Sequence, residues 1–198
     1  SHYSVFNIQN LLIDICLHLG SLLAIIAYFI KDLLNLVQNK DFLIKILIAT
    51  IPLIPVGYLF YYSGLINSLR NIEVIAWISL VFGILLYFSD KMKINNDLNS
   101  GFSFKSAIII GLFQVVSLIP GVSRSGITIT AARLMGFNRF DSTKISFFLA
   151  IPALSAASIL GIYNIYKEGS SELNFLAIIA VLFSFTFSVS SHFSASSK

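Results

Sequence analysis

Charge and cysteine are scarce in this sequence of 198 residues. Charged residues make up 11% of the chain, whereas a soluble domain has about 25%. The one cysteine, Cys16, excludes an internal disulfide and a metal site built from several cysteines, and its place in an apolar run predicts a small packed side chain. The 13 basic residues exceed the 9 acidic ones, but they are scattered among short loops, so we expect no nucleic-acid partner.

Apolar residues dominate what is present. They form 57% of the chain, and the mean hydropathy is +0.87. Several apolar runs approach or exceed the roughly 18 to 20 residues that cross a bilayer as a helix. These runs cover residues 11–30, 42–62, 73–89, 104–119, 145–163 and 174–191. The sequence therefore predicts an all-α, polytopic integral membrane helical bundle, organised as a single membrane domain over residues 1–198 and surrounded by membrane lipids.

The first apolar run carries two ionisable side chains on one helical face. Asp14 and His18 are four residues apart. Asp14 is predicted to lie near the positive N-terminal end of a helix, and His18 either forms an interhelical hydrogen bond or lies near an active site. Gly20 and Ala24 have the same spacing, which favours close contact between two membrane helices.

Two of the four prolines, Pro52 and Pro55, fall within the second apolar run. Each removes a backbone donor, so the helix is expected to kink or break there. Such a break either exposes backbone groups to a central cavity or is purely structural. Pro152 interrupts a later run and hints at a related broken helix.

Basic loop residues distinguish two paths for residues 104–136, because lysine and arginine in short loops favour the cytoplasm. If residues 104–119 cross the bilayer completely, seven basic residues lie inside and four outside. If residues 104–136 instead enter the membrane and return, only Arg70 and Lys167 lie outside. The nine inside are then Lys31, Lys40, Lys45, Lys91, Lys93, Lys105, Arg139, Lys144 and Lys198. The count favours a re-entrant helix-turn-helix.

The turn of this re-entrant region contains Pro120, Gly121 and Gly126. Residues 127–136 are about half of the length that a crossing requires, which agrees with a return to the same side. Gly136 is predicted to end the returning helix, and Asp141 to cap the next one.

The stretch "PGVSRSGITIT", residues 120–130, places Arg124 at membrane depth. Burying an arginine there costs about 2.5 to 3.5 kcal/mol even on the lenient insertion scale, so a partner is required. A phosphate fits, because a guanidinium binds it through paired hydrogen bonds, and glycine and serine let helix N-terminal amides approach an anion. The candidate phosphate-binding residues are Ser123, Arg124, Ser125, Gly126 and Thr128. Alternatively, Arg124 pairs with a carboxylate or caps exposed carbonyls in a simple turn.

Other polar residues flank this turn. Gln114 and Ser117 are three residues apart and either line the same cavity or, as the more ordinary interpretation, form interhelical hydrogen bonds. Arg133 lies near the return to the interface, where its side chain is expected to extend toward water.

"PGVSRSGITIT" followed by "ARLMGFNR" resembles the second signature of the bacterial undecaprenyl-diphosphatase, or bacitracin-resistance, family. "DICLHLGSLLAIIAYF" and "FFLAIPAL" resemble the family's early helix and the segment after the signature. The resemblance implies a membrane enzyme with inverted repeats that converts undecaprenyl diphosphate to undecaprenyl phosphate for peptidoglycan synthesis. It also implies a divalent cation, Mg or Ca, and an active site open to the outer face of the bacterial plasma membrane. A homo-oligomer is compatible with the resemblance.

The resemblance also suggests roles for single residues. Arg124 matches the family's phosphate-binding arginine, Ser123 the neighbouring serine and Thr128 the motif threonine, which makes Arg124 and Ser123 candidate catalytic residues. His2 matches the end of the first signature as an acid, base or nucleophile helper. The acidic part of that signature and the last helix have no counterpart, so a fragment is expected and the metal ligands stay unknown. A lipid-phosphate transporter, or a structural or channel-like membrane protein, is the alternative.

Overall fold

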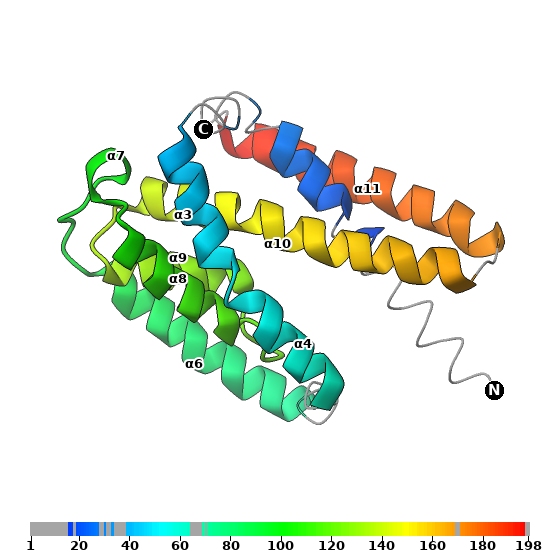
Figure 1. Ribbon diagram of the computed structural model, residues 1–198, viewed down its shortest axis with the longest axis horizontal. Helices are drawn as coiled ribbons and strands as arrows, with labels where there is room; N and C mark the ends of the chain where they lie inside the picture. Colours follow the sequence, from blue (N-terminus) through cyan, green and yellow to red (C-terminus); the bar gives the residue numbers. More distant parts are fainter. Residues whose placement is uncertain are drawn as a thin grey trace. The chain divides into compact units, whose positions relative to one another are not determined.

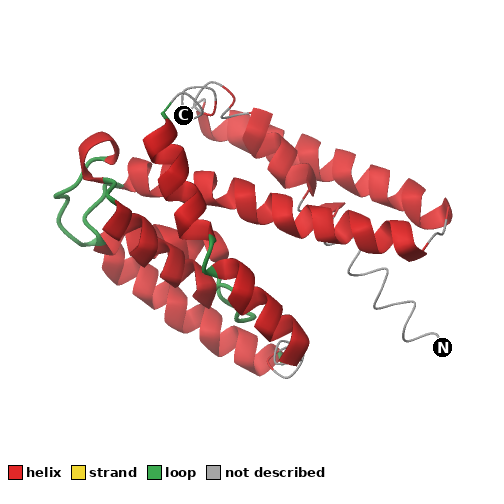
Figure 2. Cartoon of the chain, viewed as in Figure 1, coloured by secondary structure: helices red, strands yellow, loops and turns green. Residues whose placement is uncertain are grey.

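Figure 1 presents the computed structural model of the chain, which describes residues 16–17, 19–27, 30, 33, 39–63, 69, 71–168 and 171–196. Every regular element in these ranges is a helix (Figure 2). The helices are α3 (Lys40–Thr50), α4 (Leu53–Ser63), α6 (Ile72–Asp90), α7 (Leu98–Gly101), α8 (Phe104–Val116), α9 (Arg124–Leu134), α10 (Arg139–Glu168) and α11 (Ser171–Ser196). The prediction of an all-α fold is confirmed.

The chain divides into two compact units. One comprises Ser1–Asn35 with Ile151–Lys198, and the other comprises Leu36–Ala150. Helix α10 begins in the Leu36–Ala150 unit and continues into the other. The single membrane domain and the inverted repeats stay predictions.

The second apolar run breaks at the first of its two prolines, as predicted. Helix α3 ends at Thr50, the Ile51 amide contacts the carbonyls of Leu47 and Ile48, and α4 starts at Leu53, directly after Pro52. Pro55 lies in the first turn of α4, where a missing amide removes no helical hydrogen bond. The two prolines therefore differ in effect: only Pro52 stands at a break.

Residues 40–60 and 72–90 are long and apolar enough, by length and composition, to cross a bilayer. The N-terminus of α6 is capped by Asn71, whose side chain accepts a hydrogen bond from the Glu73 amide. Large apolar side chains of α6 are exposed, among them Trp77, Leu80, Val81, Ile84, Tyr87 and Phe88. In water such a surface would be strongly unfavourable, whereas in a bilayer it faces lipid. The protein is a membrane protein.

Helices α8 and α9 form the predicted helix-turn-helix. At 1.5 Å per residue they extend about 20 Å and about 16 Å, short of a hydrocarbon core of about 30 Å. They pack against each other, α8 also packs against α3 and α4, and α9 packs against α6. Gly111 of α8 approaches the Ala49 backbone of α3 so closely that a Cβ atom would not fit.

The two ends of this hairpin meet. The amides of Asn95 and Asn96 both donate to the Gly136 carbonyl, at 2.9 and 3.0 Å, and Asn96 pairs with Phe137 in a parallel bridge. Gly136 has a φ of +85°, which suits glycine, and follows the end of α9 as predicted. The chain therefore enters and leaves residues 104–136 at one end of the hairpin, as a re-entrant path requires, while the position of the hairpin in the membrane stays a prediction.

The other unit contains helical residues 16–17 and 19–27 and α11. A Cβ atom on Gly20 would lie 2.5 Å from the Val181 carbonyl oxygen, so the close contact predicted at Gly20 is confirmed. The Ser184 hydroxyl donates to the Leu17 carbonyl at 2.7 Å and lies 3.1 Å from the Ser21 hydroxyl. Cys16 is buried, as its apolar run predicted.

Candidate functional site

The tip of the α8–α9 hairpin is fixed against α6. Gly121 has a φ of +98°, and a Cβ atom there would lie 2.7 Å from the Ile75 carbonyl oxygen. The Ser79 hydroxyl donates to the Gly121 carbonyl at 2.9 Å. Only glycine tolerates both this backbone conformation and this close approach. The turn that precedes Arg124 is therefore held in a defined position.

Ser123 starts α9 as its N-cap. Its hydroxyl accepts a hydrogen bond from the Gly126 amide at 3.2 Å and lies 3.3 Å from the Ser125 hydroxyl. Both serines are exposed. The amides of Arg124 and Ser125, at the first positions of the helix, have no intrahelical acceptor. Free amides, two hydroxyls and the positive end of the helix dipole together suit an anion.

Arg124 is half-buried beside this helix start and contacts main-chain carbonyls. Its Nη1 donates to the Ala150 carbonyl at 3.4 Å, and its Nη2 donates to the Leu149 carbonyl. These carbonyls lie in the part of α10 just before Pro152. Helix α10 continues through Pro152, so the broken helix expected there is wrong. The structure thus contains the carbonyl contacts that were one alternative for Arg124, and its partners among the described residues include no carboxylate.

The guanidinium of Arg124 keeps donors for another ligand. Two of the five N–H groups of an arginine are used by carbonyls here, and the buried Nε has no hydrogen-bond partner within the described part of the chain. A buried, unsatisfied donor next to exposed serine hydroxyls is a position where an anion gains strong hydrogen bonds.

Thr128 is buried, and its hydroxyl is engaged inside the protein. It lies 2.7 Å from the Ser146 hydroxyl of α10 and within hydrogen-bond distance of the Arg124 and Ser125 carbonyls, at 3.0 and 3.1 Å. This geometry joins α9 to α10 next to Arg124. The phosphate contact expected of Thr128 stays a prediction.

The interhelical hydrogen bonds expected of Gln114 and Ser117 are wrong. Gln114 is 0% exposed, and neither polar atom of its side chain has a hydrogen-bond partner among the described residues. Ser117 donates at 2.7 Å to the carbonyl of Gln114, within its own turn. A hydroxyl near a helix end satisfies itself in this local way when no acceptor of another helix is within reach.

Arg133 does not extend toward water, so this prediction is wrong. It is 3% exposed, donates to the carbonyls of Phe137, Asp90 and Met92 at 2.5, 2.6 and 3.1 Å, and its Nε lies 3.5 Å from an Asp90 carboxylate oxygen. The chain reversals after α6 and α9 leave these carbonyls without helical partners, and one guanidinium satisfies them together. Sequence reasoning missed this arrangement.

Asp141 is not the cap of α10, which corrects a further prediction. Asn138 precedes the helix, and its side-chain oxygen accepts from the Asp141 amide at 2.8 Å. The Asp141 carboxylate accepts from the Asn138 side-chain amide at 2.8 Å and from the Leu98 amide at 3.1 Å. This reciprocal pair resembles a capping box, in which the acidic residue stands three positions after the cap.

His2, Asp14 and His18 lie outside the described residues. Among the residues that are described, no three or more His, Cys, Asp and Glu side chains form a group that could hold a metal ion. The described part of the site therefore consists of Arg124, Ser123, Ser125 and the start of α9.

Comparison with known proteins identifies the family. The profile of the bacitracin resistance protein BacA family matches residues 2–193. The chain belongs to this BacA family. The family resemblance of "PGVSRSGITIT", and of the segments around it, is thereby confirmed.

Individual relatives have related sequences over most of the chain. The undecaprenyl-diphosphatase of Pelagibacter ubique (strain HTCC1062) is 52% identical over 184 residues, which cover 92% of this chain and 72% of the relative. The undecaprenyl-diphosphatase of Roseobacter denitrificans (strain ATCC 33942 / OCh 114) is 41% identical over 167 residues, 77% of this chain and 62% of the relative. The chain thus spans about two thirds of the length of these curated relatives.

Proposed function

We propose that the full-length protein hydrolyses undecaprenyl diphosphate to undecaprenyl phosphate and inorganic phosphate, which returns the lipid carrier to peptidoglycan synthesis. The names of its relatives support this substrate. The observation in the structure that carries the proposal is Arg124 beside the open N-terminus of α9, with unused guanidinium donors and two exposed serine hydroxyls.

The chemistry follows from these groups. Water attacks the terminal phosphorus, the bond from that phosphorus to the bridging oxygen breaks, and the bridging oxygen leaves with undecaprenyl phosphate. Phosphoryl transfer depends mainly on positioning and charge stabilisation, and Arg124 with the first amides of α9 supplies both. Ser123 and Ser125 would orient the terminal phosphate through their hydroxyls, at the positive end of the helix.

The carbonyl contacts of Arg124 contribute to this role. Hydrogen bonds to Leu149 and Ala150 hold the guanidinium plane in place before substrate arrives. A group that is already positioned loses less conformational entropy on binding than a free arginine side chain. Thr128 supports the same arrangement through its hydrogen bond with Ser146.

Further parts of the proposal rest on the family resemblance. His2 would act as acid, base or nucleophile helper, and a divalent cation, Mg or Ca, would neutralise charge on the phosphates when bound. The described residues form no group of side chains that could hold this ion. The protein would lie in the inner membrane with its site open to the outer face and the lipid tail between helices.

Phosphate release separates this function from lipid-phosphate transport. Purified full-length protein in detergent, supplied with undecaprenyl diphosphate and Mg or Ca, is expected to produce inorganic phosphate and undecaprenyl phosphate in equal amounts. In parallel, vesicles that contain the protein and the labelled lipid report movement of the head group between leaflets. Head-group movement without any phosphate release, in either preparation, would contradict the proposal and favour a transporter.

A further inference from the structure

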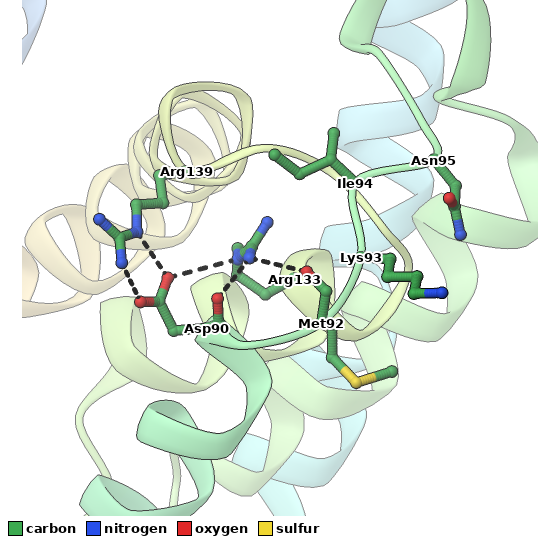
Figure 3. A pocket seen from close by; sticks show the side chains of 7 residues that line it. All are labelled: Asp90, Met92, Lys93, Ile94, Asn95, Arg133 and Arg139. Atoms are coloured by element: carbon green, nitrogen blue, oxygen red, sulfur yellow. Dashed lines mark hydrogen bonds and ion pairs between the residues drawn. The ribbon is translucent and has the colours of Figure 1, made fainter.

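A second polar site lies at the end of α9 away from Arg124. It is a cavity of about 690 Å³ within the Leu36–Ala150 unit, formed where α6 ends and the chain passes from α9 to α10 (Figure 3). Its lining residues are Asp90, Met92, Lys93, Ile94, Asn95, Arg133 and Arg139. None of them belongs to the phosphate site proposed above, from which the length of α9, about 16 Å, separates them.

The lining carries more positive than negative charge. Lys93, Arg133 and Arg139 stand against one carboxylate, Asp90, which lies between the two arginines in Figure 3. Arg133 is buried and occupied by carbonyls, whereas the Arg139 side chain is 78% exposed. Arg139 directs Nε and Nη2 to Asp90 and leaves Nη1 for another acceptor. Lys93 is exposed and has no hydrogen-bond or ion-pair partner within the described residues.

The rim of the cavity has the composition of a membrane surface. Met92 and Ile94 are 47% and 63% exposed although both are apolar. Just before them, exposed aromatic rings of Tyr87 and Phe88 end the apolar surface of α6, and the Lys91 ammonium lies 4.2 Å from the centre of the Tyr87 ring. Aromatic and basic side chains together mark the boundary between lipid tails and head groups.

We propose that this cavity binds the phosphate head group of an anionic phospholipid such as phosphatidylglycerol. Lys93 would contact the phosphate, and Arg139, on the other side of the opening (Figure 3), would add to the positive charge that attracts it, while the acyl chains lie along the exposed apolar surface of α6. A small soluble anion would use the basic residues but would gain nothing from Met92, Ile94 and the α6 surface. The combination of basic cavity, apolar rim and adjacent lipid-facing helix therefore favours a lipid.

The interaction would also stabilise the base of the re-entrant hairpin. The cavity residues belong to the segment that bonds to Gly136 and to the guanidinium of Arg133. A lipid seated there contacts both the end of α6 and the start of α10. This proposal does not depend on the enzymatic function, because it concerns different residues and a different ligand.

Lipid binding can be measured by native mass spectrometry of the full-length protein in detergent. Phosphatidylglycerol and phosphatidylcholine with identical acyl chains are titrated, and we expect the first bound phosphatidylglycerol to be retained more tightly. Lys93→Gln removes a charge without breaking a hydrogen bond or ion pair seen in the structure, and should weaken this first binding about fivefold. The double variant Lys93→Gln with Arg139→Gln should weaken it further.

The control for the double variant is Lys40→Gln with Lys105→Gln. It also removes two positive charges, but from exposed lysines outside the cavity. This control should retain phosphatidylglycerol like the wild type. Equal retention of both lipids by the wild type would overturn the proposal. So would an equal loss of phosphatidylglycerol affinity in the double cavity variant and in the control. Full displacement of phosphatidylglycerol by millimolar inorganic phosphate would also overturn it, because it would identify a site for small anions.

Discussion

Asn96 and Phe137 lie side by side in a parallel bridge, although the whole α8–α9 hairpin separates them in sequence. The chain therefore enters and leaves the hairpin at this bridge, so both ends of residues 104–136 lie at the same end of the hairpin. The turn that carries Arg124 lies at the closed end of the hairpin, and we predict that it lies within the depth of the bilayer. Irregular backbone is tolerated there only where protein or water covers it.

Cysteine labelling tests this path. In a Cys16→Ala background, Ser103→Cys marks the start of the hairpin and Phe140→Cys marks the chain just after it. Both positions are exposed. We expect an impermeant thiol reagent to label both from the same side of the membrane. Ile72→Cys, at the opposite end of α6, should be labelled from the other side. Labelling of Ser103→Cys and Phe140→Cys from opposite sides would refute the re-entrant path.

Gly121→Ala should disrupt the tip of the hairpin. The added Cβ atom would require an unfavourable backbone angle and would collide with the Ile75 carbonyl, which together cost at least about 1 to 3 kcal/mol. Gly83→Ala on α6 is the control, because nothing lies within 4 Å of a Cβ atom there. Thermal unfolding in detergent should show a clearly lower melting temperature for Gly121→Ala and no decrease for Gly83→Ala. Equal melting temperatures would contradict the docked turn.

Much of this arrangement could be predicted from local rules. Pro52 breaks its helix because no proline amide can continue the hydrogen bonds, and Gly136 ends α9 because its φ is positive. The return of the chain after α9 agrees with the count of lysines and arginines in loops. Each of these predictions depends on the backbone preference of one residue type or on the number of basic residues in the loops. None of them requires knowledge of how the helices pack.

Contacts between distant segments could not be predicted in this way. The position of Arg133 in the sequence predicts a side chain at the water interface, but three carbonyls that converge around it make burial favourable. The sequence predicts an interhelical partner for Gln114, yet its side-chain amide is buried without a partner among the described residues. The sequence alone does not choose between the partners of Arg124, because only the folded chain reveals the carbonyls of Leu149 and Ala150 beside it. The path of the backbone decides all three.

Thr128→Val and Thr130→Val distinguish the contact between α9 and α10 from a purely local hydrogen bond. Both threonines are buried and lie close to a carbonyl four residues earlier, but only Thr128 also contacts Ser146. Thr128→Val leaves a buried serine hydroxyl without this partner and should reduce stability by about 1 to 3 kcal/mol. Unfolding of both variants in mixed micelles should show a smaller loss of unfolding free energy for Thr130→Val than for Thr128→Val. A larger effect of Thr130→Val would count against the role assigned to Thr128.

Ser123→Ala and Ser103→Ala compare two helix caps of the same kind. Each serine accepts a hydrogen bond from the amide three residues later, at 3.2 Å, so each variant should lose about 1 kcal/mol of stability. Only Ser123 lies beside Arg124. Phosphate release from undecaprenyl diphosphate should therefore fall at least tenfold in Ser123→Ala and stay near the wild-type rate in Ser103→Ala. Similar rates for the two variants would remove Ser123 from the site.

The most direct test of the account is the rate of phosphate release when Arg124 is replaced in the full-length protein. Arg124→Gln can still donate to the Leu149 or Ala150 carbonyl but carries no charge, and Arg124→Lys keeps the charge but loses the paired donors. We predict that both variants fold, that Arg124→Gln lowers kcat/KM about 100-fold to 1,000-fold, and that Arg124→Lys lies between it and the wild type. A folded Arg124→Gln variant that releases phosphate at the wild-type rate would contradict the account.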